Sequence, residues 1–246
     1  MIALFTDFGM TGPYIGQMRA KLISMLESYH PVVDLMLDAP SCNPKAASYL
    51  LAAITKDLPL GSIVIAVVDP GVGSEDREPI LLEADGRHFI GPGNGLFGPL
   101  MQHSTKAKLH KIIWRPESLS STFHGRDLFA PFAAKLLNDD LRNGDGLQEM
   151  KLDSMPSLGP ADLAEVVYVD HFGNAMTGLR ASAVSISDRV WINGHELGYA
   201  STFSDVPQGD VFWCINSSGL VEIAVNCGRA ADALNVSVGC ELQVLS

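Results

Sequence analysis

The sequence contains few basic residues. Lys and Arg number 17 against 28 Asp and Glu, which gives the 246-residue chain a formal net charge of −11. Proteins that bind the phosphate backbone of nucleic acids need clusters of Lys and Arg to displace counterions. The composition therefore argues against nucleic acid as a partner, while a small nucleotide held in a pocket remains compatible with it.

Long apolar runs and patterned cysteines are also absent. No apolar run reaches the roughly 18–20 residues that a membrane helix needs, so we expect no membrane partner. The N-terminal MIALFTDFGMTG has no basic segment and meets Asp7 within its first apolar stretch, which argues against a signal peptide. Cys42, Cys214, Cys227 and Cys240 form neither a CxxC pair nor a metal-binding spacing. We interpret them as free thiols in a reducing cytoplasm.

The first half of the chain alternates strand-like runs with segments of helical spacing. Apolar residues make up 47% of the sequence, enough for a substantial core. The expected strands include Ile2–Thr6, Val32–Leu37 and Ser62–Val68, and the expected helices include Tyr14–Ser28, Pro44–Ile54 and Asp127–Leu137. This alternation predicts an α/β domain over residues 1–153, with a mostly parallel sheet flanked by helices.

The pattern changes after this domain. Residues 154–163, SMPSLGPADL, carry two prolines and a glycine and are typical of a linker. Short β-like runs separated by Gly, Asn, Asp and Pro follow, at Glu165–Val169, Arg189–Ile192, Val211–Ile215, Leu220–Val225 and Glu241–Leu245. They predict a smaller all-β, barrel-like domain over residues 164–246.

Polar loops follow or precede several of the expected α/β elements. They are TDFG (6–9), DPGVGS (69–74), GPGNG (91–95) and FHGRD (123–127). Each taken alone has a structural interpretation, since Asp often caps a helix and glycine-rich segments often form turns. Ligands of open α/β sheets bind beyond the carboxyl ends of the strands, however, and four such loops exceed what turns require. The β domain adds VDHFGN (169–174) and NSSG (216–219), which are weak signals on their own.

The order of these motifs carries a resemblance. TDFG, VDPGVGS, GPGN, FHGRD, VDHFGN and NSSGLVEIAVN follow one another as in the S-adenosyl-L-methionine (SAM) hydroxide adenosyltransferases, which the sequence resembles from Ile2 to about Leu245. These adenosine-forming SAM hydrolases, also called the DUF62 family, are related to the SAM-dependent fluorinase and chlorinase. The resemblance implies an α/β N-terminal and a β-barrel-like C-terminal domain. It also implies a homotrimer, with each active site between the N-domain of one subunit and the C-domain of its neighbour.

The implied reaction is hydrolysis of SAM to adenosine and L-methionine by attack of water on ribose C5′, without a metal or cofactor. The family's proposed water-activating set is an Asp, an Arg and a His. Asp69 and His124 match the Asp and the His. Asp76 stands at the usual position of the Arg and Arg77 follows it, so we assign the Arg role to Arg77.

The resemblance also implies a set of substrate-binding residues. Asp7 matches the carboxylate that takes the ribose hydroxyls, and Tyr14 and Asn94 fall at substrate-lining positions. In the C-terminal domain the matching residues are Asp170 for the methionine ammonium, Asn174 for the adenine edge, Ser217 and Ser218 for the methionine carboxylate, and Arg229 and the Ala231 backbone for adenine. Phe203 either stacks on the purine or packs in the core.

Some positions depart from the family pattern and keep alternatives open. Gly12 replaces an acid that is common in the family, and Leu37 replaces a common His. Many family members also have an aromatic residue near the position of Cys42. Halide attack on the same carbon is the first alternative, although the hydrolase-type His124 favours water. A catalytically silent adenosine- or SAM-binding protein is the second. A metallohydrolase that uses Asp69, His124 and Asp127 lacks a supporting ligand spacing.

Overall fold

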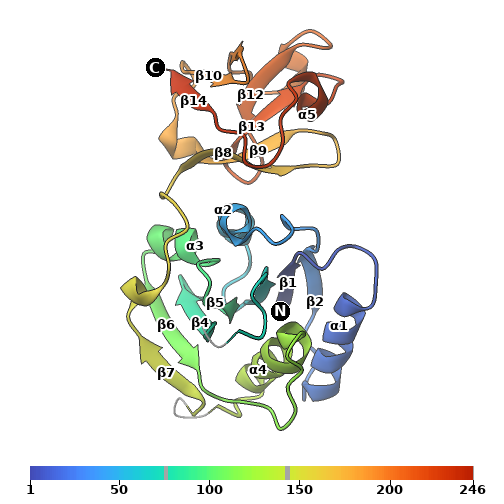
Figure 1. Cartoon of the computed structure of the whole chain (residues 1–246), viewed down its shortest axis with the longest axis vertical. Helices are drawn as coiled ribbons and strands as arrows, with labels where there is room; N and C mark the ends of the chain where they lie inside the picture. Colours follow the sequence, from blue (N-terminus) through green and yellow to red (C-terminus); the bar gives the residue numbers. More distant parts are fainter. Residues whose placement is uncertain (75–76, 142–144, 246) are drawn as a thin grey trace. The chain divides into compact units, whose positions relative to one another are not determined.

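The computed structural model describes residues 1–74, 77–141 and 145–245, and it divides into two compact units (Figure 1). The first unit comprises Met1–Leu51 and Asp57–Leu158, and the second comprises Ala52–Lys56 and Gly159–Ser246. The change of unit after Leu158 falls within the segment that the composition marks as a linker. Within the described residues, no helix has the length and apolar character needed to cross a bilayer.

A seven-stranded sheet with the order β2-β1-β3-β5-β4-β6-β7 forms the centre of the first unit. One side of the sheet is parallel and consists of β2 (Val32–Met36), β1 (Ile2–Thr6), β3 (Ile63–Val67) and β5 (Arg87–Pro92). The other side is antiparallel and adds β4 (Pro79–Ala84), β6 (Ala107–Ile112) and β7 (Leu147–Met150). The predicted α/β class is confirmed, and the antiparallel side is a feature that the sequence analysis does not specify.

Helices cover both faces of this sheet (Figure 1). On one face lie α1 (Tyr14–Met25) and α4 (Ala130–Leu137), and on the other lie α2 (Pro44–Thr55) and α3 (Gly98–His103). Met18 and Leu22 of α1 and Phe132 of α4 are fully buried against the apolar strands, which explains the helical spacing of their apolar residues. The first expected helix ends at Met25, three residues before Ser28.

The segment around FHGRD is more irregular than the expected single helix over Asp127–Leu137. A π-helical turn, η1 (Gly125–Phe129), precedes α4, and the amide of Ala130 donates to the carbonyl of Gly125 five residues earlier. Pro131 follows directly, and because it has no N–H it cannot donate an α-helical hydrogen bond to the carbonyl four residues earlier. The chain therefore changes its helical pitch at the residues next to His124, and π-turns of this kind are frequent at functional sites.

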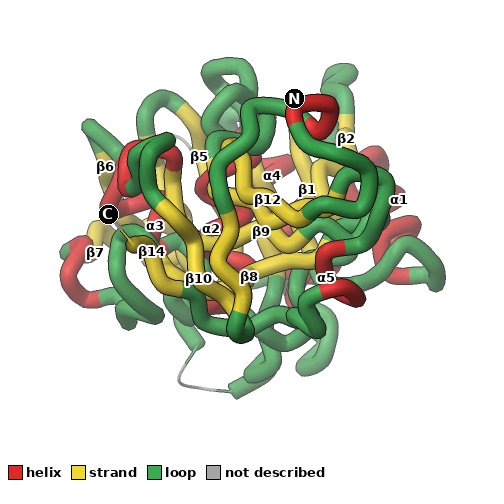
Figure 2. Tube along the Cα trace, turned by 90° about the horizontal axis from the view of Figure 1, so that it is seen from above, coloured by secondary structure: helices red, strands yellow, loops and turns green. Residues whose placement is uncertain are grey.

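The second unit is antiparallel, and Figure 2 shows it mostly as strands and loops. One sheet has the order β12-β13-β9-β8, with β8 (Leu163–Val169), β9 (Ala175–Arg180), β12 (Val211–Ile215) and β13 (Leu220–Val225). The other has the order β11-β10-β14, with β10 (Arg189–Ile192), β11 (His195–Leu197) and β14 (Gln243–Leu245). The core includes Trp213, which is fully buried, and α5 (Ala230–Ala233) is a short helix. The prediction of a smaller all-β region is confirmed.

Short 3₁₀ turns also occur among the described residues. They are η3 (Leu152–Ser154), η4 (Ala181–Ala183) and η5 (Phe203–Asp205). In η5, Thr202 and Asp205 form a reciprocal capping box. This cap holds the loop that carries Phe203.

Candidate active site

Glycines let three of the polar loops of the first unit pack directly on one another. A Cβ on Gly125 of FHGRD would lie 3.2 Å from the ring of Phe8 in TDFG. A Cβ on Gly73 of DPGVGS would overlap the carbonyl oxygen of Ser121, just before FHGRD. Gly73 also has a φ of +84°, which favours glycine independently. The contacts bring the loops that carry Asp7, Asp69 and His124 together.

Asn94 of the GPGNG loop supports the start of the DPGVGS loop. The residue is only 4% exposed. Its Nδ2 donates to the carbonyl of Val68 at 2.9 Å, and its Oδ1 accepts from the amide of Leu96 at 3.2 Å. Both ends of the amide are therefore bound to main chain, and one of them fixes the residue directly before Asp69.

Two carboxylates in this loop cluster, those of Asp7 and Asp69, repel each other electrostatically. Asp7 follows β1, and its Oδ2 accepts from the amide of Cys42 at 2.9 Å. Asp69 follows β3, and its Oδ1 accepts from the amide of Gly71 at 3.2 Å. Burial raises the pKa of Asp7 above its usual value; the hydrogen bond from Cys42 opposes this rise, and the negative charge of Asp69 adds to it.

His124 belongs to the same cluster and is partly buried at the start of the π-turn. Burial lowers its pKa below the usual value for histidine, because desolvation disfavours the imidazolium. The charges of Asp69 and Asp127 act against this effect, and that of Arg115 adds to it. The result favours a neutral imidazole beside Asp69 at neutral pH, which is the protonation state of a proton acceptor.

Arg77 lies against the DPGVGS loop. A Cβ on Gly71 would stand 2.9 Å from the Nε and Nη2 atoms of Arg77, so the guanidinium covers the backbone two residues after Asp69. In the part of the chain that the structure describes, no ion pair joins Arg77 to the Asp69 carboxylate. Asp76, which occupies the usual position of the family's Arg, lies outside the described residues.

Tyr14 joins an aromatic group beside the cluster. Its ring is half-exposed and packs edge-on against Phe123, with ring centroids 5.4 Å apart, and it lies 6.0 Å from the ring of Phe8. Phe8 and Phe123 also pack edge-on, at 5.7 Å. These residues flank Asp7 and His124 in the sequence, so the aromatic group is an apolar wall next to the polar side chains.

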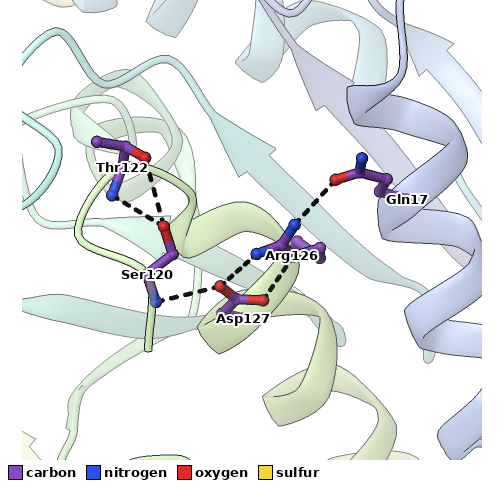
Figure 3. A network of polar contacts seen from close by, with 5 residues as sticks. All are labelled: Gln17, Ser120, Thr122, Arg126 and Asp127. Atoms are coloured by element: carbon purple, nitrogen blue, oxygen red, sulfur yellow. Dashed lines mark hydrogen bonds and ion pairs between the residues drawn. The ribbon is translucent and has the colours of Figure 1, made fainter. Parts of the chain in front are cut away.

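A network of polar contacts around Asp127 joins the two ends of the loop that carries His124 (Figure 3). Arg126 donates to both carboxylate oxygens of Asp127, from Nε at 2.6 Å and from Nη2 at 2.8 Å. Asp127 Oδ2 also accepts from the amide of Ser120 at 3.1 Å, and Arg126 Nη1 donates to Gln17 of α1 at 2.9 Å. Asp127 therefore binds a residue seven positions upstream and does not cap its own helix. His124 lies inside the loop that this contact closes.

A cavity of about 870 Å³ lies in the second unit. Five of the predicted site residues line it: Asp170, Asn174, Phe203, Ser217 and Arg229. Residues that the sequence analysis did not assign to the site also line it, among them Met176, Cys214, Asn216, Glu222 and Cys227. Of these residues, Glu222 is the one that the sequence could have indicated best, because it is a single carboxylate within the apolar run LVEIAV.

The predicted site residues of this unit differ in whether they line the cavity and in which hydrogen bonds they already make within the protein. Asp170 accepts from the amide and the side chain of Asn174, at 2.8 and 3.1 Å. Ser218 is not among the lining residues, and its carbonyl accepts from Lys56. Ala231 does not line the cavity either, and its amide donates to Gly173 while its carbonyl accepts from Val236.

The described residues contain no group of three or more His, Cys, Asp or Glu side chains arranged to hold a metal ion. Asp69, His124 and Asp127, the set considered for a metallohydrolase, do not form such a group, since Asp127 is bound by Arg126.

Comparisons with known proteins agree with the motifs. The family models described as the SAM hydroxide adenosyltransferase N-terminal and C-terminal domains match residues 2–143 and 164–243. The chain belongs to the SAM hydroxide adenosyltransferase family. Among its relatives, the (R)-S-adenosyl-L-methionine hydrolase of Thermus thermophilus is 34% identical, with 99% of each chain covered. The protein of the same name from Salinispora arenicola is 35% identical, over 99% of this chain and 97% of the relative.

Solved structures extend the likeness to the fold of this family member. An uncharacterized conserved protein from Thermotoga maritima has a TM-score of 0.87 at 29% identity, with both chains covered completely. A conserved hypothetical protein from Thermus thermophilus has a TM-score of 0.79 at 31% identity, with 99% of each chain covered.

Replacing Gly73 tests the contact between the DPGVGS and FHGRD loops. We expect Gly73→Ala to lower the free energy of unfolding by about 1–3 kcal/mol more than Gly61→Ala, because overpacking forces the Ser121 backbone to move. Gly61 is a matched control, since it also has positive φ but no neighbour within 4 Å of an added Cβ. Urea denaturation of both variants measures the difference, and equal losses would contradict the contact.

Charge changes at the Arg126–Asp127 pair should move the pKa of His124 in opposite directions. Asp127→Asn removes a negative charge that raises this pKa, so the pKa should fall further below its usual value. Arg126→Gln leaves Asp127 uncompensated, so the pKa should rise. Imidazole resonances of His124, followed by NMR against pH, measure both shifts. Shifts of the same sign in the two variants would show that loop disorder, and not charge, dominates.

Proposed function

We propose that this protein hydrolyses SAM to adenosine and L-methionine, with a preference for the (R) epimer at sulfur that the names of its relatives specify. The observation that carries the proposal is the loop cluster of the first unit, where the charge of Asp69 acts on both Asp7 and His124. Such a group of carboxylates and a neutral imidazole suits the binding of a hydroxylated sugar and the handling of a proton from water.

The chemistry requires one bond to form and one to break. An oxygen of water forms a bond to C5′ of the ribose, the C5′–S bond breaks, and its electron pair stays on sulfur as the neutral thioether of methionine. The sulfonium is a good leaving group without protonation. The protein therefore has to align one water molecule with the C5′–S bond and accept the proton that this water loses.

The first unit supplies groups for these two tasks. His124 accepts the proton, since burial keeps its imidazole neutral. Asp69 orients the water and stabilises the imidazolium that forms, and Arg77 supplies positive charge beside the Asp69 loop. Asp7 accepts hydrogen bonds from the ribose hydroxyls, and Tyr14 adds an apolar wall.

The cavity of the second unit has groups for the remainder of the substrate. Phe203 offers a ring for stacking on adenine, and Asn174 offers an amide edge for its hydrogen bonds. The family resemblance assigns Ser217 and Ser218 to the methionine carboxylate and Asp170 to the methionine ammonium, and of these Ser217 and Asp170 line the cavity. The family resemblance adds Arg229 and the Ala231 backbone for adenine, and of these Arg229 lines the cavity.

Product analysis with SAM tests this function. Wild-type protein in halide-free buffer should release adenosine and methionine in equal amounts, with oxygen from ¹⁸O-labelled water in the adenosine. His124→Ala and Asp69→Ala should lower kcat by about 10²–10⁴-fold, because each removes part of the proton transfer. Asp7→Ala should act mainly on KM. Product formed only with chloride or fluoride would select a halide adenosyltransferase, and thermal stabilisation without turnover would select a silent binder.

We further propose that the protein is a cytoplasmic homotrimer whose active sites combine the first unit of one subunit with the second unit of another. The family resemblance supports this proposal. Co-expression of Asp69→Ala and Asn174→Ala subunits should then restore about a quarter of the wild-type activity, because a quarter of randomly assembled sites combine two intact units. Either variant alone should be inactive while keeping its thermal stability. No recovery in mixed assemblies would place each site within one subunit.

A further inference from the structure

Glu222 is a carboxylate on the wall of the cavity in the second unit. It lies in the middle of β13, and the residue is only 6% exposed. Its cross-strand neighbours are Cys214 on β12 and Met176 on β9, and all three line the cavity. Adjacent strands therefore present a row of one carboxylate between a thiol and a thioether, which is an unusual place for an acid that only supports the fold.

The protein itself provides little to compensate this carboxylate. Asn216 donates from Nδ2 to Glu222 Oε2 at 3.1 Å, and within the described residues no Lys or Arg forms an ion pair with it. Burial raises the pKa of Glu222, the Asn216 hydrogen bond opposes this, and the negative charge of Asp170 adds to the rise. A buried carboxylate without a cation is costly, so a positively charged partner would stabilise it.

The other charges on the cavity wall do not meet this need. Arg229 is the cationic residue among those that line the cavity, but its Nε pairs with Asp232 at 3.0 Å and its Nη1 donates to the His171 carbonyl at 2.8 Å. Asp170, the second carboxylate on the wall, is bound by Asn174. The cavity thus presents two acids and a guanidinium that is already paired.

The chemistry of the ligand follows from this charge pattern. A neutral amino group, such as that on adenine, does not offset the desolvation of a carboxylate, whereas an ammonium group does. A sulfonium carries charge but has no N–H to donate. We propose that Glu222 is a specificity-determining residue that binds the α-ammonium of an amino-acid moiety in this cavity, which, given the proposed function, is the methionyl part of SAM.

Three stable ligands separate this role from others. S-adenosylhomocysteine has the adenosine and the α-ammonium, its desamino analogue keeps the carboxylate but lacks the ammonium, and 5′-methylthioadenosine lacks the amino acid entirely. Calorimetric titration of Glu222→Gln should show an affinity about 10- to 100-fold weaker for S-adenosylhomocysteine, as expected for loss of a charge-assisted hydrogen bond. Affinities for the other two ligands should stay within about twofold of wild type.

Glu196→Gln provides the matched control, because Glu196 is an exposed residue on β11 of the same unit and the substitution makes the same charge change. It should leave all three affinities unchanged. If Glu222→Gln unfolds in thermal scans, Glu222→Asp keeps the charge with a shorter reach, and should weaken only S-adenosylhomocysteine. An equal loss for all three ligands would overturn the proposal in favour of adenine contact or a collapsed cavity, and no loss would overturn it outright.

These titrations do not depend on turnover, so they separate this inference from the proposed function. Wild-type protein that binds S-adenosylhomocysteine more tightly than its desamino analogue, but releases no adenosine from SAM, would contradict the hydrolase and leave the role of Glu222 standing. Wild-type protein that binds none of the three ligands would overturn the role of Glu222.

Discussion

Close backbone packing between loops is the constraint on which the polar cluster of the first unit depends. A Cβ on Gly73 would overlap the Ser121 carbonyl, and a Cβ on Gly125 would lie unusually close to the Phe8 ring. The loops that follow β1 and β3 are thereby held against the segment before α4. Asp7, Asp69 and His124 then share one electrostatic environment, although they are far apart in the sequence.

The fold could be predicted where one physical signal dominates a segment. β1 and β3 are buried along their whole length, so their apolar runs identify them directly. β4 and β6 were missed because charged residues interrupt their apolar pattern. Some of these polar residues have partners across the sheet: Glu83 of β4 pairs with His110 of β6, and Lys111 of β6 pairs with Glu78 just before β4. A strand whose charges have partners only in the folded sheet does not stand out in the sequence.

The candidate site shows the same limit. Motif position predicts that Asp69 and His124 belong to a ligand-binding edge, because each adjoins a regular element. It does not predict that Asn94 binds the Val68 carbonyl, or that Asp127 pairs with Arg126 and the Ser120 amide. These contacts depend on the exact course of turns, and a change of one rotamer would redirect them. Glu222 was missed because an apolar strand pattern indicates which residues are buried, but not which groups a buried carboxylate contacts.

Net charge distinguishes the substrate of the proposed reaction from its products. SAM has a net positive charge, since its sulfonium and ammonium outnumber its carboxylate. Hydrolysis removes the sulfonium and releases a neutral nucleoside and a zwitterionic amino acid. Carboxylates such as Asp170 and Glu222, and a chain with a net charge of −11, therefore attract the substrate more strongly than either product. The chemical step removes the sulfonium, so the products lose one of the two positive charges on which this attraction acts, while methionine keeps the α-ammonium that we assign to Glu222.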